Sequence, residues 1–180
     1  MVRISTKAIC VAAIGAVSCA VLGGIALAAQ DKYTLQVPGG LAFAEFKGFE
    51  SWQTISVSQS GALIEVILGN PAMIDAYAAG IPGNGRKFPD GAKMAKIHWN
   101  TKQSTEAPAP TTVPSSLHDV DFMVKDSKKY ASSGGWAYAQ FDYTAATDSF
   151  KPMGTGTQCG TSCHTIVKAK DYVFTAYGKR

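Results

Sequence analysis

The stretch WQTISVSQSGALIEVIL, residues 52–68, decides the fold of this chain. Polar and apolar residues alternate over residues 52–59, which is the two-residue period of a strand with one buried face. Gly61 favours a turn, and residues 63–68 form a second run of strand length. We therefore predict two neighbouring strands, at 52–59 and 63–68.

Further segments continue this organisation along the chain. Asn70 and Pro71 are typical of a helix N-cap and first helical position, and Gly80 favours the end of that helix. More strands are expected at 93–99, 120–124 and 136–143, and the proline-rich stretch 101–116 is expected to be a loop. Strands joined by turns, with one or two helices, predict an α+β fold with an antiparallel β-sheet and a few helices.

The N-terminus has the composition of a secretory signal peptide. Arg3 and Lys7 are basic, residues 8–26 are uncharged and mostly apolar, and Ala26-Leu27-Ala28 offers small residues for cleavage. An uncleaved membrane anchor is the alternative, because the run approaches the length of a transmembrane helix. We predict a signal peptide at 1–29 and one exported domain at 30–180.

The charge of this domain excludes one class of partner. Loss of Arg3 and Lys7, the only charged residues of the predicted signal peptide, lowers the formal net charge from +4 to +2. No basic stripe with interleaved aromatic residues is present, so we predict no nucleic-acid binding.

The motif CGTSCH, residues 159–164, is typical of covalent haem attachment. Each thiol can add to a haem vinyl group, and the adjacent imidazole can reach the iron. Three residues separate Cys159 from Cys163, where the common pattern has two. A disulfide between these thiols is the main alternative. A zinc site is disfavoured, because only His98 and His118 remain as extra ligands.

Several short segments occur in a characteristic order around this motif: FESW at 49–52, NP at 70–71, FPDG at 88–91, VKDSK at 124–128, GWAY at 135–138, CH at 163–164 and DYVFT at 171–175. In this respect the chain resembles the cytochrome P-460 family and its relative cytochrome c prime beta. The resemblance implies a periplasmic homodimer with one covalently attached haem c, and its iron, in each chain near the C-terminus.

Carried over to this sequence, the resemblance implies roles for particular residues. Cys159 and Cys163 match the thioether positions, and His164 matches the iron ligand. Lys96 matches a lysine that is bonded to the haem macrocycle in cytochrome P-460, with Lys93 as the nearest alternative. Strand alternation places Lys96 on the less apolar face of its segment, so the pattern alone also fits a solvated lysine.

Asp121 matches the carboxylate that hydroxylamine-oxidising members hold over the open side of the iron. The family residue is a glutamate, so the carboxylate here is one methylene shorter. A general base must come within about 3 Å of the proton that it takes, and a misplacement of about 1 Å can cost on the order of a hundredfold in rate. A solvated strand residue, or a turn partner of His118, is the alternative.

Other side chains are candidates for roles around the haem. The possible sixth iron ligands are His98, His118, Met94, Met123 and Met153. An apolar cap over the haem or ordinary core packing would suit Phe43, Phe46 and Phe122. The lysines Lys125, Lys128 and Lys129 suit a solvated turn, or a docking site for an acidic redox partner.

Three functions follow from these expectations. The first is oxidation of hydroxylamine, with Asp121 as base and an acceptor cytochrome as electron partner. The second is binding of nitric oxide in an apolar pocket without turnover. The third is simple electron transfer, which requires a sixth protein ligand to the iron.

Overall fold

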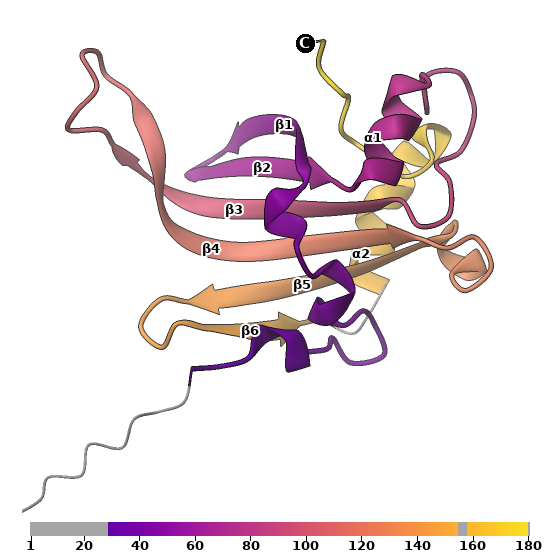
Figure 1. Ribbon diagram of the computed structural model, residues 1–180, viewed down its shortest axis with the longest axis horizontal. Helices are drawn as coiled ribbons and strands as arrows, with labels where there is room; N and C mark the ends of the chain where they lie inside the picture. Colours follow the sequence, from indigo (N-terminus) through magenta and orange to yellow (C-terminus); the bar gives the residue numbers. More distant parts are fainter. Residues whose placement is uncertain (1–28, 155–157, 180) are drawn as a thin grey trace, which may run out of the picture.

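The structure, a computed structural model, describes residues 29–154 and 158–179; of Gln158 and Cys159 only the backbone is described. The predicted signal peptide therefore lies outside the described residues, except for its last position. Six strands form one antiparallel sheet whose spatial order follows the chain (Figure 1). The strands are β1 (Gln53–Ser60), β2 (Leu63–Gly69), β3 (Lys93–Gln103), β4 (Thr112–Lys125), β5 (Trp136–Thr144) and β6 (Ser149–Met153).

Two short α-helices and five 3-10 helices accompany the described part of the sheet. They are α1 (Pro71–Ala78), α2 (Gln158–His164), η1 (Lys32–Thr34), η2 (Phe43–Phe46), η3 (Phe49–Ser51), η4 (Ala131–Ser133) and η5 (Thr165–Lys170). The α+β class with an antiparallel sheet is thus confirmed. No helix of the described ranges is long and apolar enough to cross a membrane.

The predicted helix after the first strand pair is confirmed. The side chain of Asn70 accepts a hydrogen bond from the backbone N–H of Met73, and Pro71 occupies the first helical position. The Asn70 side chain also accepts from the backbone N–H of Lys93. One polar residue therefore starts α1 and ties it to the beginning of β3.

The expected loop at 101–116 is shorter than predicted. Strand β3 continues to Gln103 and β4 begins at Thr112, so Pro114 lies in a strand opposite Thr101. Strand β5 pairs with β4 only from Asp119 onward. Pro114 therefore lies in a two-stranded extension, where β4 has a neighbouring strand on one side only and proline is tolerated. Strand β6, which contains Pro152, was not predicted and forms an edge of the sheet.

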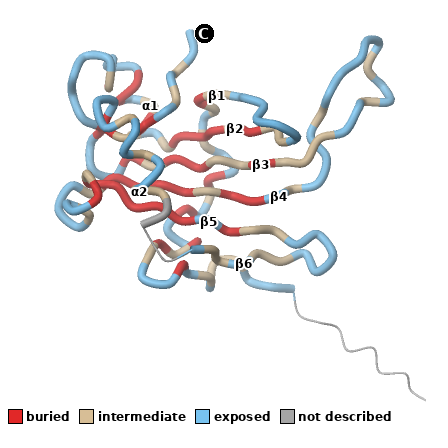
Figure 2. Tube along the Cα trace, turned by 180° about the vertical axis from the view of Figure 1, so that it is seen from behind, coloured by how far each residue is buried: buried red, intermediate tan, exposed pale blue. Residues whose placement is uncertain are grey.

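Alternation along the strands gives the sheet two different covered faces. One face packs against η2 and η3, where Phe46 stacks on Phe122 at 4.2 Å between ring centroids. The other face is covered by α1, α2 and the C-terminal segment, seen in front of the sheet in Figure 2. The predicted alternation in β3 is confirmed, because buried Ala95 belongs to the first face while Met94 belongs to the second.

Candidate active-site cavity

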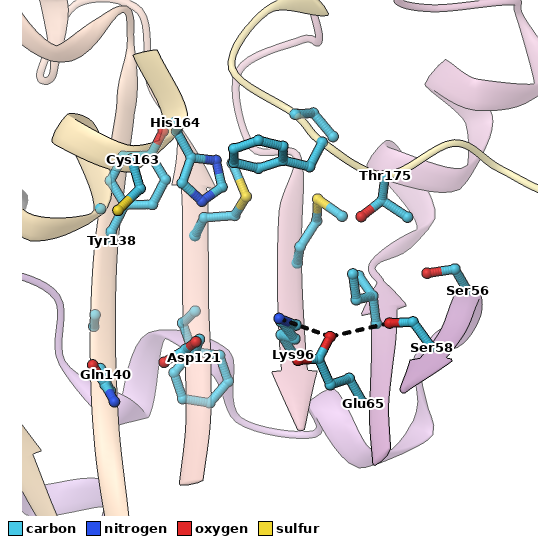
Figure 3. A pocket seen from close by; sticks show the side chains of 18 of the residues that line it. Ser56, Ser58, Glu65, Lys96, Asp121, Tyr138, Gln140, Cys163, His164 and Thr175 are labelled. Carbon is cyan, nitrogen blue, oxygen red and sulfur yellow. Dashed lines mark hydrogen bonds and ion pairs between the residues drawn. The ribbon is translucent and has the colours of Figure 1, made fainter. Parts of the chain in front are cut away.

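A cavity of about 710 Å³ lies between the second face of the sheet and the C-terminal segment. Its volume falls in the range of small-molecule and cofactor pockets, roughly 300–1,000 Å³. Figure 3 shows His164, Cys163 and Tyr138 at one end, and Lys96, Glu65 and Asp121 at the other. Met94, Met123 and Phe174 also line it.

His164 is the last residue of α2 and presents one ring nitrogen to the cavity. Its Nδ1–H donates to the backbone carbonyl of Tyr172 at 2.6 Å, which leaves Nε2 as the nitrogen available to a metal. Its ring lies between Tyr138 and Phe174, at centroid distances of 4.6 and 5.0 Å. Burial lowers the pKa of His164, so the neutral form that binds iron is favoured.

The Tyr172 carbonyl is held by a buried ion pair one residue earlier in the chain. Lys125 Nζ donates to both carboxylate oxygens of Asp171, at 2.8 and 3.0 Å. Asp171 also accepts from the backbone N–H of Phe88 at 2.8 Å, and its carbonyl accepts from Trp136 Nε1 at 2.8 Å. The prediction that Lys125 belongs to a solvated turn or a docking cluster is wrong, because Asp171 draws it into the core.

Close packing holds α2 against strand β5. A Cβ added to Gly160 would come within 2.2 Å of Cγ of Tyr138, so only glycine allows this approach. Cys163, three residues later, lines the cavity as a free, exposed thiol. The side chain of Cys159 lies outside the described residues, so neither its thioether role nor the alternative disulfide is tested.

Lys96 points into the polar end of the cavity. Its Nζ lies 3.0 Å from Glu65 Oε2, which also accepts from Ser58 Oγ at 3.0 Å. Burial acts to raise the pKa of Glu65, but the hydrogen bond and charge of Lys96, with help from Ser58 and His98, hold it below its ordinary value. Lys93 lies on the opposite face, where it donates to the Glu45 carbonyl at 2.5 Å.

Asp121 enters the same end of the cavity from β4. It pairs in register with Lys96 on β3 and with Gln140 on β5, so the three side chains share one face. Its side chain is 41 % exposed, while its Oδ1 is buried and has no hydrogen-bond partner. Burial and then the charge of Asp119 raise the pKa of Asp121 from 3.8 to about 6.

A hydrogen-bonded group of side chains lies next to Asp121 on β3 and β4. His98 Nδ1 contacts Asp119 Oδ1, and the other oxygen of Asp119 lies 2.5 Å from Nδ1 of His118. Burial acts to raise the pKa of Asp119, but its hydrogen bonds to the two histidines hold it below the ordinary value. His118 therefore pairs with Asp119, so the alternative that Asp121 is its turn partner is wrong.

The remaining candidates divide between the cavity and the rest of the molecule. The three candidate methionine ligands, Met94, Met123 and Met153, line the cavity. His98 and His118 are absent from its lining, and both are engaged with Asp119. Phe43 and Phe46 belong to the opposite core, where their aromatic contacts to Phe122 make packing their role.

Sequence reasoning missed three residues of the site: Glu65, Ser58 and Tyr138. Glu65 is a single carboxylate within the apolar run of β2, which is a signal for a buried charge with a partner. The partner, Lys96, lies on the neighbouring strand and over thirty residues away in sequence, so only the strand register reveals it.

The lining fits the haem group that the resemblance implies. Among the described residues, two buried side-chain atoms lack a hydrogen-bond partner, the Asp121 Oδ1 and the Tyr138 hydroxyl, and both residues line this cavity. Buried polar atoms without a partner are uncommon and indicate a missing ligand or water. With the oriented His164 and the Cys163 thiol, the donor set suits an iron porphyrin held by a histidine and thioethers.

Comparison with models of known families matches residues 46–175 to the family described as Cytochrome P460. The match includes the whole sheet, α1, α2 and all of the cavity residues described above. None of the curated proteins matches the chain.

Proposed function

This chain belongs to the cytochrome P460 family, and from that premise we propose that it is a periplasmic, homodimeric c-type haem protein that oxidises hydroxylamine. Membership of the family implies a haem cofactor with its iron. The covalent attachment, the substrate and the acceptor cytochrome are parts of the proposal. The observation that carries it is that one cavity contains both an oriented histidine and a carboxyl group with a buried oxygen that has no hydrogen-bond partner.

Four side chains would hold the haem in this cavity. His164 offers Nε2 to the iron, since its Nδ1–H is bound to the Tyr172 carbonyl. Cys159 and Cys163 supply the thioether bonds. Lys96 is the lysine of the cavity lining and is the residue that we propose carries the bond to the macrocycle. When bound, the haem supplies an iron that can coordinate the substrate nitrogen and accept its electrons.

Asp121 is the proposed base. Its carboxyl group lies at the end of the cavity away from His164, where the substrate would be deprotonated (Figure 3). A pKa near 6 suits a general base that works close to neutral pH. The charged pair of Lys96 and Glu65 beside it fixes the polar end of the cavity, while Met94 and Met123 keep the intervening lining apolar.

Binding of nitric oxide without turnover is the second candidate. The apolar methionine and phenylalanine lining favours it, and so does a carboxylate that is one methylene shorter than the family glutamate. A small uncharged gas requires no base. In that case Asp121 would be free to change without loss of ligand binding.

The deciding experiment compares four proteins expressed with a haem-maturation system: the unaltered protein, Lys96→Met, Lys93→Met and Asp121→Ala. We expect a strongly red-shifted Soret band in the reduced unaltered protein and in Lys93→Met, and an ordinary c-type spectrum in Lys96→Met. Hydroxylamine turnover should be lost in Asp121→Ala while haem stays bound. An ordinary spectrum of the unaltered protein, with nitric oxide binding and no turnover, would establish the second candidate instead.

A further inference from the structure

We propose that a relay of three side chains carries the proton from Asp121 to the protein surface, an inference that rests on the proposed function. The relay consists of His98, Asp119 and His118. None of the three lines the cavity, so they would not touch the substrate and would act as positioning and proton-transfer groups. The proton path would leave the polar end of the cavity along the same face of the sheet, because His98 and Asp119 lie two residues from Lys96 and Asp121 on β3 and β4.

The geometry supplies each link. Asp121 Oδ2 lies 4.0 Å from Nδ1 of His98, a gap that a small rotation of either side chain closes. The same nitrogen contacts Asp119, and Asp119 contacts His118 at 2.5 Å. The inner links are shielded, because the side chains of His98 and Asp119 are 9 and 6 % exposed, whereas His118 is 47 % exposed. The relay thus begins at the cavity and ends in solvent.

The other charged groups that face Asp121 do not offer a second exit. Lys96 on β3 is paired with Glu65 on β2, and Glu65 Oε1 lies 3.5 Å from Nε2 of His98. That contact holds the His98 ring at Nε2, the nitrogen opposite the one that contacts Asp119. Asp142 on β5 acts on Asp121 through its charge and accepts a hydrogen bond from Gln140. Of the groups named, His118 alone combines a link to Asp119 with wide exposure.

Protons balance along the relay. Asp121 accepts one proton from the substrate. His98 gives its Nδ1 proton to Asp119 and takes the proton of Asp121 at the same nitrogen. Asp119 passes a proton to Nδ1 of His118, and the opposite ring nitrogen of His118 releases one to water. The pKa of Asp119 is held below its ordinary value, so Asp119 passes the proton on and does not store it. One proton enters and one leaves, and no oxidant is required.

The first test is chemical rescue in the haem-loaded protein. His98 is buried and its replacement could unfold the chain, so the exposed His118 is changed. We expect His118→Gln to lower hydroxylamine turnover by at least about tenfold, short of the 10²–10⁴-fold effect of losing a general base. Added imidazole should restore the rate. Asp142→Asn is the matched control, because it changes the field at Asp121 without removing a link, and imidazole should leave its rate unchanged.

The second test needs no turnover. In the haem-loaded, CO-bound ferrous protein, the ring-nitrogen NMR shifts of His118 should change when Asp121 titrates, and the Asp121→Asn substitution should remove that change. The relay would be overturned if the Asp121→Asn substitution left the pH dependence of the His118 shifts unchanged. It would also be overturned if the His118→Gln variant kept full turnover and did not respond to imidazole. An unaltered protein that does not oxidise hydroxylamine refutes the proposed function, and the NMR coupling then decides the relay by itself.

Discussion

The buried ion pair between Lys125 and Asp171 should control both stability and the haem ligand. The Lys125→Met substitution keeps an unbranched side chain that is one atom shorter but removes its charge. Asp171 would retain the Phe88 N–H as a donor and lose both bonds to Lys125 Nζ. An uncompensated carboxylate would then remain in the core, next to the residue whose carbonyl orients His164.

The magnitude follows from the burial of the pair. Its side chains are only 2 and 3 % exposed, so water cannot replace the lost partner. Breaking a buried pair by removing one member costs about 3–5 kcal/mol. For a domain of this size, a loss of that order lowers the melting temperature by roughly 6–20 °C. Lys125 also contacts the Gly134 carbonyl and the Trp136 ring, which places the expected loss in the upper part of the range.

The assay is thermal unfolding of the haem-loaded protein, with Lys32→Met as the matched control. Lys32 forms an ion pair with Glu50 at 2.6 Å, but the two side chains are 29 and 49 % exposed. An exposed pair is worth about 0–1 kcal/mol, so the control should melt within a few degrees of the unaltered protein. The double variant Lys125→Met/Asp171→Asn removes both charges and should recover part of the loss.

Equal losses in Lys125→Met and Lys32→Met would refute this reasoning, because burial of the pair would then have no energetic consequence. A functional readout accompanies the measurement. If the pair positions the Tyr172 carbonyl, Lys125→Met should also change the reduction potential of the folded fraction, whereas Lys32→Met should leave the potential unchanged.

Three further predictions concern the cavity. The pKa of Asp121 is raised to about 6 in the folded protein, so the folded chain holds its proton more tightly than the unfolded chain does, and stability falls as the pH rises from about 4 to 6. The Asp121→Asn substitution should remove this fall. It should raise the melting temperature relative to the unaltered protein at pH 8 but not at pH 3.5. Gly160→Ala would force α2 away from Tyr138 and should cost about 1–3 kcal/mol in urea unfolding, while Gly178→Ala, whose added Cβ meets nothing within 4 Å, should be neutral. Tyr138→Phe removes a buried hydroxyl that has no partner and should leave haem-free stability unchanged or higher; a loss above about 1 kcal/mol would show that the hydroxyl is satisfied.

Local sequence determined most of the secondary structure. The alternation in residues 52–68 predicted β1 and β2 because a strand with one buried face has a period of two. Asn70 and Pro71 predicted the start of α1 because their hydrogen-bonding and backbone preferences act within one helical turn. The CH pair at 163–164 likewise marked a candidate haem ligand from adjacent residues alone.

Contacts between distant residues could not be predicted in this way. Lys125 ends β4 just before a lysine-rich turn and has the local sequence of an exposed residue, yet its partner Asp171 is 46 positions later. Lys96 lies on the less apolar side of its strand, which alone fits exposure to solvent. Only the covering of that face by the C-terminal segment converts this polar side into the end of a cavity.

The sequence by itself therefore determined most of the strands, the first helix and the candidate haem ligands, because propensity, capping and short motifs depend on neighbours in the chain. The tertiary structure alone decided which face of the sheet forms the cavity, and that His98 and Asp119 come together with Asp121 at its polar end. Strand register brings these side chains within 4.8 Å, and register is set by the pairing of whole strands, which no local pattern contains.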